Sequence, residues 1–265
     1  MTTEQYQLYE PIQHILERPD MYVGSKQKEE IEDYVYKVDF DKTVECAGQL
    51  VKTKIVVSPA FYRTFLEILS NAVDNLERKS TKPMSYIEVV LTKDQISVTN
   101  DGAVIPITIN DHGIYNHSLI FGHLLSGSNY DDNKTRFTAG RNGLGAKLTN
   151  VLSKEFTVEG VDPDRGLKLV QTWTNNMKNT SGPKVTKSKT TNGYTRVTWK
   201  PDLKWFGMST IDNRIIEYLS ASCVYSAMTA GTVISKPLKV KLNILAKNGD
   251  LVHFFCPINL TLFLI

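Results

Sequence analysis

The fold of this chain is decided by one stretch of its sequence, Glu67-Ile68-Leu69-Ser70-Asn71-Ala72-Val73-Asp74-Asn75. This stretch lies within a longer segment, Pro59 to Lys79, in which apolar side chains recur every three or four residues. That spacing is typical of an amphipathic helix. Ser58 can cap such a helix and Pro59 suits its first position, so the sequence predicts a helix that begins at Pro59.

The polar side of this predicted helix carries residues that could meet a ligand. Glu67, Asn71 and Asp74 are spaced i, i+4 and i+7 and lie within roughly 60° of one another around the helix axis. A solvated helix face would produce the same spacing. Alternatively, the carboxylate could orient and deprotonate a water molecule, and the amide oxygen could ligate Mg²⁺. The helix alone leaves both interpretations open.

A second candidate is a glycine-rich segment that precedes and begins another predicted helix, Ala139-Gly140-Arg141-Asn142-Gly143-Leu144-Gly145-Ala146-Lys147. Glycine allows a backbone to approach a ligand closely, and the N–H groups of a first helical turn attract phosphate. Lys147 adds a positive charge one turn further on. The segment is neither a Walker A sequence nor a dinucleotide-binding fingerprint. A flexible connector is the alternative, although the long polar loop before the segment suggests a lid.

A third candidate is the turn Asn100-Asp101-Gly102, which follows a predicted hairpin of two strands, Tyr86 to Leu91 and Gln95 to Thr99. By itself this turn indicates nothing more than a change of chain direction. The turn becomes a candidate part of a binding site only because the other two candidate segments occur in the same chain.

The remaining pattern mixes helices and strands with hairpins, which favours an α+β fold over a doubly wound parallel sheet. The further predicted helices are His117 to Leu125, Leu144 to Leu152 and Ser209 to Ala227. The further predicted strands are Lys154 to Glu159, Leu167 to Thr174, Tyr194 to Lys200, Leu238 to Leu245 and Leu251 to Phe255. Two polar segments, Ser126 to Gly140 and Asn175 to Asn192, are predicted to be exposed loops.

Composition narrows the class of protein. The 265 residues are 41% hydrophobic, which is enough for a sizeable core, and the net charge of +3 neither requires nor excludes nucleic acid. Cys46, Cys223 and Cys256 match no zinc or disulfide pattern, so we expect a reducing compartment. We expect no membrane span because no run of 18 apolar residues occurs. The polar N-terminus also shows no signal peptide.

The order of the three candidates resembles the GHKL ATPase superfamily, whose fold is the Bergerat two-layer sandwich, a mixed β-sheet covered on one face by helices. Further segments resemble type IIA DNA topoisomerases, particularly the eukaryotic and large-virus branch. These segments are Arg18 to Ser25, Leu124 to Asp132, Gln171 to Trp173, Asn175 to Met177 and Pro201 to Leu203. The resemblance runs from about Pro11 to Leu245.

The resemblance implies roles for individual residues in binding ATP and Mg²⁺. Glu67 matches the glutamate that activates the attacking water, and Asn71 matches the asparagine that ligates magnesium. Asn100 matches the residue that recognises adenine, and its side-chain oxygen could accept from the adenine amino group. The other residues that match the ATP site are Asn75, Gly102, Ser128, Asn129, Arg141, Asn142, Gly143, Leu144, Gly145 and Lys147.

Two positions depart from the family pattern. Val104 stands where the family has a glycine, and a β-branched residue disfavours positive φ and adds bulk beside the adenine pocket. We therefore expect that Val104 could reduce ATP affinity. Gly127 replaces a serine that is usual in the branch.

The resemblance also predicts a domain organisation. Residues 1–17 would be an N-terminal strap, residues 18–253 the ATPase domain, and residues 254–265 a truncated apolar tail. The family's transducer lysine, Toprim cluster and DNA-cleaving domain have no counterpart in this sequence. Hydrolysis by this chain alone is therefore expected to be slow or absent.

The implied function is ATP binding and, in the full enzyme, hydrolysis that closes a dimer gate during DNA strand passage. The implied partners are a second copy of the chain and duplex DNA. The protein would be intracellular, nuclear if eukaryotic and in the host cell or virion if viral. The alternative is a nucleotide-binding paralogue or interaction module with weak or no activity. A histidine kinase core is disfavoured because no phospho-acceptor helix precedes the site.

Overall fold

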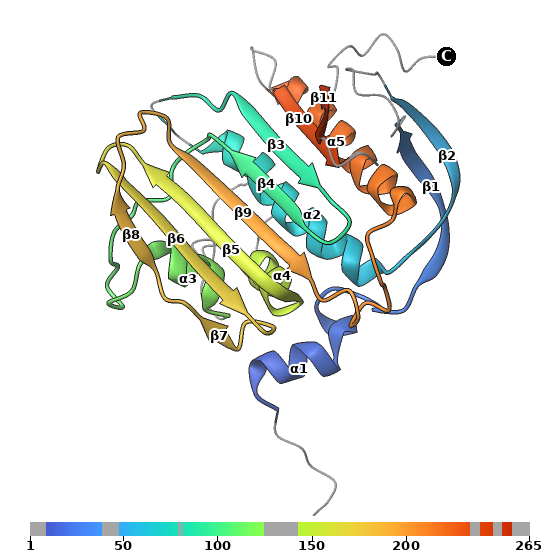
Figure 1. Ribbon diagram of the computed structural model, residues 1–265, viewed down its shortest axis with the longest axis horizontal. Coiled ribbons are helices and arrows are strands. Elements are labelled where there is room, and N and C mark those ends of the chain that lie inside the picture. Colours follow the sequence, from blue (N-terminus) through green and yellow to red (C-terminus); the bar gives the residue numbers. More distant parts are fainter. Residues whose placement is uncertain are drawn as a thin grey trace, which may run out of the picture.

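The computed structural model describes residues 9–38, 48–78, 80, 82–124, 143–233, 239–245 and 251–255. Within these residues one large mixed sheet is covered on one face by helices, as the sequence predicted (Figure 1). Neighbouring strands run in the order β11-β10-β3-β4-β9-β5-β6-β7, and β8 also pairs with β6. Only β10 and β3 pair in parallel among these strands.

The strands of this sheet follow the alternation in the sequence closely. In β9, for example, Val197 and Trp199 are buried toward the helices while the residues between them face away. The bounds are β3 Tyr86–Leu91, β4 Ile96–Asn100, β5 Ser153–Asp162, β6 Leu167–Thr174, β7 Asn179–Thr180, β8 Lys184–Lys187, β9 Tyr194–Pro201, β10 Lys239–Leu245 and β11 Leu251–Phe255.

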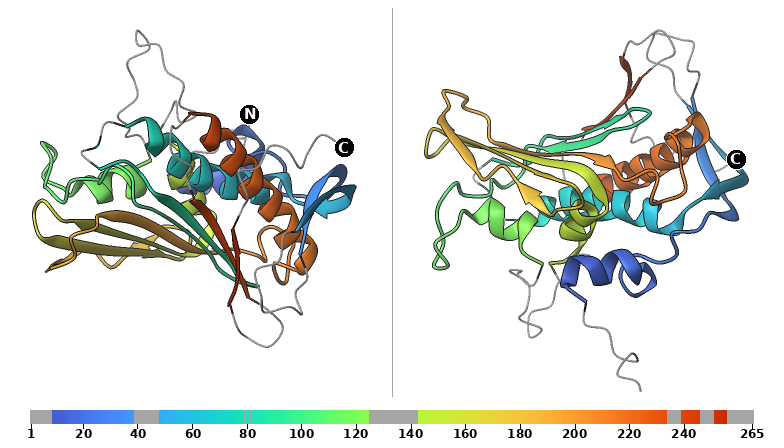
Figure 2. Two further views of the ribbon diagram at one scale, coloured as in Figure 1. Left: turned by 90° about the horizontal axis from the view of Figure 1, so that it is seen from above. Right: turned by 60° about the horizontal axis from the view of Figure 1, so that its bottom comes forward.

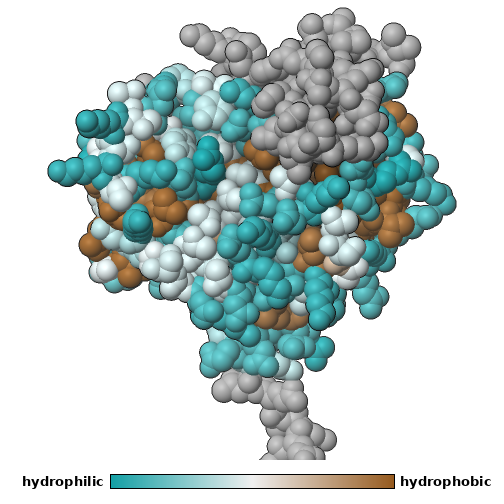
Figure 3. Space-filling view, viewed as in Figure 1, coloured by the Kyte–Doolittle hydropathy of each residue, from teal (hydrophilic) through white to brown (hydrophobic). Residues whose placement is uncertain are grey.

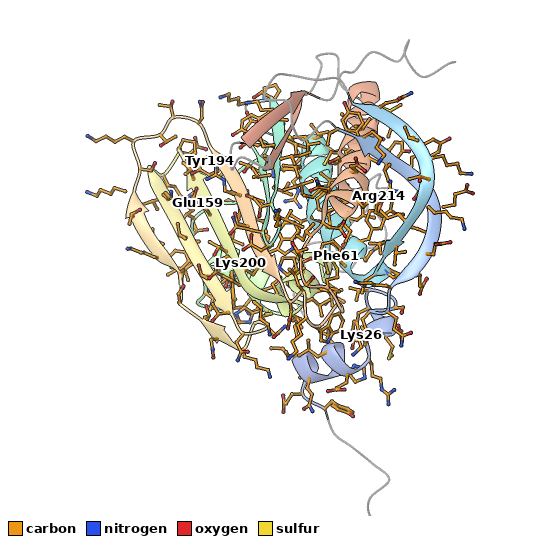
Figure 4. The ribbon with its side chains drawn as sticks, turned by 45° about the vertical axis from the view of Figure 1, so that its right-hand side comes forward. Lys26, Phe61, Glu159, Tyr194, Lys200 and Arg214 are labelled. Atoms are coloured by element: carbon orange, nitrogen blue, oxygen red, sulfur yellow. The ribbon has the colours of Figure 1, made fainter. Side chains whose placement is uncertain are left out.

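The central helix is α2, Pro59–Asp74, which continues into a 3₁₀ turn, η3, Asn75–Glu77. Ser58 caps it as predicted, because its hydroxyl oxygen accepts from the N–H of Phe61 at 3.3 Å. The apolar side of α2 is buried in the core between the sheet and the neighbouring helices, and Figure 4 places Phe61 in the interior. The other helices are α1 Pro11–Glu17, α3 Asn116–Gly122, α4 Gly145–Val151 and α5 Asn213–Val233, with a short 3₁₀ turn, η2, at Pro19–Met21.

Two further strands, β1 Glu29–Lys37 and β2 Gln49–Val57, form an antiparallel hairpin that packs against α5 on the far side from the sheet (Figures 1 and 2). The contact includes an ion pair of 2.6 Å between Lys37 and the buried Glu217. It also includes a hydrogen bond of 3.1 Å from the Tyr218 hydroxyl to Asp33. The sequence analysis did not predict this hairpin or helix α1.

The open face of the sheet is mainly polar (Figure 3). Glu159 lies at its centre and accepts hydrogen bonds or ion pairs from Tyr194, Lys168 and Arg196. Figure 4 shows Glu159, Tyr194 and Lys200 on adjacent strands. The carboxylate of Glu159 is thus partnered by side chains of the same face.

The prediction that Asn175 to Asn192 form a loop is wrong in part, because this segment contains β7 and β8. Both strands pair with β6, which would otherwise leave an edge of unpaired backbone groups. The lysine, threonine and serine side chains there are mostly exposed, so the composition looked like that of a loop. Helix α5 also begins at Asn213, later than the predicted Ser209, and extends beyond Ala227.

No helix within the described ranges is both long and apolar enough to cross a membrane. Cys223 is buried, whereas Cys46 and Cys256 lie outside the described residues. The predicted lid, including Gly127, also lies outside them.

Candidate functional site

One edge of α2 and η3 carries the polar residues that the sequence singled out. Glu67, Asn71 and Asn75 are each four residues apart, so they form a single line roughly 12 Å long. Asn71, in the middle, is exposed. At the two ends, Glu67 is partly buried and Asn75 is 9% exposed. Each end of the line is met by a different backbone segment.

At the first end, Glu67 faces the start of α4. A Cβ built on Gly145 would overlap Oε2 of Glu67 and lie 2.6 Å from its Cδ, so a larger residue here would push the Glu67 carboxylate away from its position. The other carboxylate oxygen, Oε1, accepts from Arg63 Nη2 at 2.6 Å. Thr149 of α4 donates its hydroxyl to the carbonyl of Thr64 at 3.0 Å, which holds the two helices together.

Lys147 lies in the first turn of α4 and is only 1% exposed. Burial lowers the pKa of its ammonium group to about 8.

At the second end, Asn75 holds the turn after β4. Its Nδ2 donates to Asn100 Oδ1 at 2.7 Å and to the carbonyl of Ala103 at 3.1 Å. Asn100 Oδ1 also accepts from the N–H of Gly102 at 3.3 Å. Because a backbone carbonyl only accepts and a backbone N–H only donates, these two contacts fix the orientation of both amides. Gly102 is required here, since a Cβ would lie 2.6 Å from Asn75 Nδ2.

Asn75 Oδ1 is buried and has no hydrogen-bond partner among the described residues. A buried acceptor without a partner is costly in a folded protein, and a bound polar ligand or water would remove that cost. The site edge therefore has a buried acceptor at its Asn75 end and an exposed amide at its middle. The start of α4, which contains Lys147, meets the Glu67 end.

Asn71 is also a reasonable ligand for Mg²⁺. This ion keeps several waters and takes few protein ligands when phosphates are present. Within the described ranges no group of three His, Cys, Asp or Glu side chains could hold a metal by itself. A metal at Asn71 would consequently be held jointly with bound phosphate.

Sequence reasoning missed two neighbours of the Asn100 turn. Asp101 is buried and accepts from the backbone N–H groups of Ser85 at 2.8 Å and Tyr86 at 3.0 Å, and also from the Ser85 hydroxyl. It therefore ties the turn to the start of β3. Thr195 of β9 lies directly opposite Asn100 and is buried on the same face of the sheet. Only strand pairing could have revealed that Thr195 adjoins the site.

The structure shows no backbone strain at Val104, and the expected effect of Val104 on ATP affinity stays a prediction. Among the described residues, positive φ outside glycine occurs at Asn175, Asn176 and Met177, so Val104 adopts no strained backbone conformation. Its bulk is instead directed at Gly193, where a Cβ would overlap Val104 Cγ2.

The structure brings together most of the described residues that the sequence predicted for the site. Gly143, which has a positive φ of 60°, and Leu144 lead into α4 beside Gly145 and Lys147. Ser128, Asn129, Arg141 and Asn142 lie outside the described residues, so their roles stay predictions.

Known proteins with similar sequences are DNA topoisomerases. The chain is 44% identical over 217 residues to DNA topoisomerase 2 of Candida glabrata, which covers 81% of this chain and 15% of that protein. It is 43% identical over 217 residues to DNA topoisomerase 2 of Invertebrate iridescent virus 6, covering 77% of this chain and 19% of that protein. The chain thus spans less than a fifth of the length of these curated relatives. No family model matches it.

Solved structures give the same result. The ATPase region of Saccharomyces cerevisiae topoisomerase II superposes with a TM-score of 0.81 and 38% sequence identity, covering 94% of this chain and 62% of that one. The ATPase and transducer domains of Balamuthia mandrillaris DNA topoisomerase II give a TM-score of 0.81 and 38% identity, covering 95% and 62%. This chain therefore belongs to the type II DNA topoisomerase family and has the fold of that family's ATPase region.

Proposed function

We propose that this chain binds ATP together with Mg²⁺ along the Glu67–Asn75 edge of α2 and η3, and that Glu67 supports hydrolysis. The proposal rests on the observation that two separate backbone segments contact the same helical edge. Gly145 of α4 approaches Glu67, and the Asn100 turn is bonded to Asn75. Asn71 lies exposed between them.

The base would be recognised by the Asn100 and Asn75 amides, with Thr195 beside them. At the other end, Gly143, Leu144, Gly145 and Lys147 would hold the phosphates, together with Arg141, Asn142 and the lid residues Ser128 and Asn129. Asn71 would ligate Mg²⁺, and the metal would supply positive charge to the phosphates when bound. Glu67 would accept a proton from the attacking water through the carboxylate oxygen that Arg63 leaves free.

We further propose that this chain forms the ATP-operated gate of a homodimeric type II topoisomerase that passes duplex DNA. The similarity to the ATPase regions of such enzymes supports this proposal. The competing hypothesis of an inactive paralogue is less favoured because Glu67, Asn71 and Lys147 are all present at the site.

Calorimetry with a non-hydrolysable ATP analogue tests ATP binding directly. We expect saturable heat in the presence of Mg²⁺ and weaker binding in EDTA, because the metal would neutralise charge on the phosphates. A UTP analogue serves as a control, since its base does not match an adenine pocket. Absence of binding by the adenine nucleotide in Mg²⁺ would contradict the proposal.

The lowered pKa of Lys147 leads us to expect that ATP affinity depends on pH. Its pKa is about 8 in the free protein, and phosphate binds the charged form. The charged fraction falls as the pH rises through 8, so affinity should fall about tenfold between pH 7 and pH 9. Calorimetry with ATP on the Glu67→Gln variant measures this while limiting hydrolysis. Lys147→Met should bind more weakly and show little dependence on pH over the same range. An unchanged slope in Lys147→Met would assign the effect to another group.

A further inference from the structure

Gly193 and Val104 fit each other in size. Gly193 directly precedes β9, and its backbone φ is not in the positive range, so its conformation does not require glycine. The atoms around Gly193, however, leave no room for a larger residue. A Cβ at Gly193 would overlap Val104 Cγ2, lie 3.0 Å from Pro163 Cδ and lie 3.2 Å from the carbonyl of Val161. Gly193 is therefore needed for space, and Val104 occupies most of that space.

Val104 belongs to a segment that is held on both sides. The carbonyl of Ala103, immediately before it, accepts from Asn75 Nδ2 at 3.1 Å. The N–H of Ile107, shortly after it, donates to Asp162 Oδ2 at 3.0 Å. Asp162 is 1% exposed and is paired with Arg165, so it forms a fixed anchor at the end of β5. Because β5 pairs with β9, this anchor and Gly193 belong to the same end of the sheet.

A short path connects this contact to the amides at the base end of the site. Gly193 sets the position of Val104, and Val104 is bonded covalently to Ala103. The Ala103 carbonyl holds Asn75 Nδ2, and the same nitrogen donates to Asn100 Oδ1. A shift of Val104 would move the carbonyl that orients the Asn75 amide, whose Oδ1 is a buried acceptor with no partner among the described residues.

We propose that Gly193 and Val104 are a matched pair of positioning residues that set the selectivity of the site for the 6-amino group of adenine. The inference rests on the proposed ATP binding and deepens it. Valine has one restricted side-chain torsion, so a new methyl group at Gly193 would push on the Val104 side chain and, through it, on the backbone that follows Ala103. Gly193 thus acts through Val104 and does not itself touch the nucleotide.

The test uses the whole chain and four variants, Gly193→Ala, Val104→Ala, the double variant carrying both changes, and Val104→Ile. Affinities for ATP and for purine riboside triphosphate, which lacks the 6-amino group, are measured in Mg²⁺ by calorimetry. The wild type should prefer ATP about fivefold to tenfold, the worth of one hydrogen bond. Gly193→Ala should lose most of that preference and at least about fivefold in ATP affinity. Val104→Ile should do the same, because it crowds the same contact from the other side.

Rescue by the double variant distinguishes a positioning role of the pair from general damage to the structure. In the double variant the smaller Val104→Ala side chain makes room for the new methyl group, so the preference for ATP should return to within about twofold of the wild type. Thr191→Ala, an exposed change in the same loop, should leave both affinities unchanged. Thermal unfolding of each ligand-free variant checks that it is folded. If Gly193→Ala does not fold, Val104→Ile and the double variant provide the comparison.

The outcomes are distinct. Loss of the ATP preference in Gly193→Ala or Val104→Ile, with its return in the double variant, supports the pair. Equal losses for both nucleotides, or no rescue, overturn it while leaving ATP binding intact. If the wild type binds neither nucleotide, the proposed function itself fails and this inference fails with it.

Discussion

Replacement of Glu67 by glutamine is expected to lower ATP turnover at least about 100-fold while ATP affinity stays within about threefold of the wild type. Glutamine keeps the size of the side chain and can still accept from Arg63, which is 2.6 Å from Glu67 Oε1. It cannot accept a proton from water at neutral pH. The loss should therefore fall on the chemical step and spare binding.

The measurement is phosphate release in single-turnover reactions, with calorimetry for binding. Glu77→Gln is a matched control, because Glu77 is exposed on η3 just beyond the site. It should behave like the wild type. Release by Glu67→Gln within about threefold of the wild-type rate would remove Glu67 from the catalytic role. Equal, very slow release by all three proteins would instead identify the chain as a binding module.

Replacement of Asn71 by alanine is expected to reduce Mg²⁺-dependent ATP affinity about 100-fold, the order of loss when a metal site is disturbed. Asn71 is exposed near the middle of the site edge, where its amide oxygen can reach a metal held by phosphate. Alanine has a higher helix propensity than asparagine, so α2 should not be weakened. Any loss of binding would therefore reflect the missing ligand.

Titration with ATP in Mg²⁺ and again in EDTA isolates the metal contribution. In EDTA, Asn71→Ala should bind ATP about as well as the wild type does. Ser70→Ala, the neighbouring position on the same helix, is the control and should keep wild-type affinity in Mg²⁺. A similar loss for Asn71→Ala in Mg²⁺ and in EDTA would mean that Asn71 contacts the nucleotide and not the metal.

Local patterns were sufficient for the elements that build the site. The predicted helix start at Pro59 and the predicted strand Tyr86 to Leu91 match α2 and β3. Both predictions succeed because periodic burial and helix capping depend on residues that are close together in the sequence. The hairpin β1–β2 was missed because its stability depends on packing against α5, which is distant in the sequence. Similarly, β7 and β8 form because the edge of β6 is available for pairing. The polar sequence of β7 and β8 does not by itself reveal that pairing.

The sequence by itself indicated a nucleotide site, through the order of Glu67, Asn71, Asn100 and the glycine-rich segment. Tertiary structure decided how those residues are held. Thr195 adjoins Asn100 only through strand pairing, and the side chain of Val104 lies where a Cβ on Gly193 would be. Chain periodicity is a property of neighbouring residues, whereas the space available to a side chain depends on residues far along the sequence that folding brings into contact.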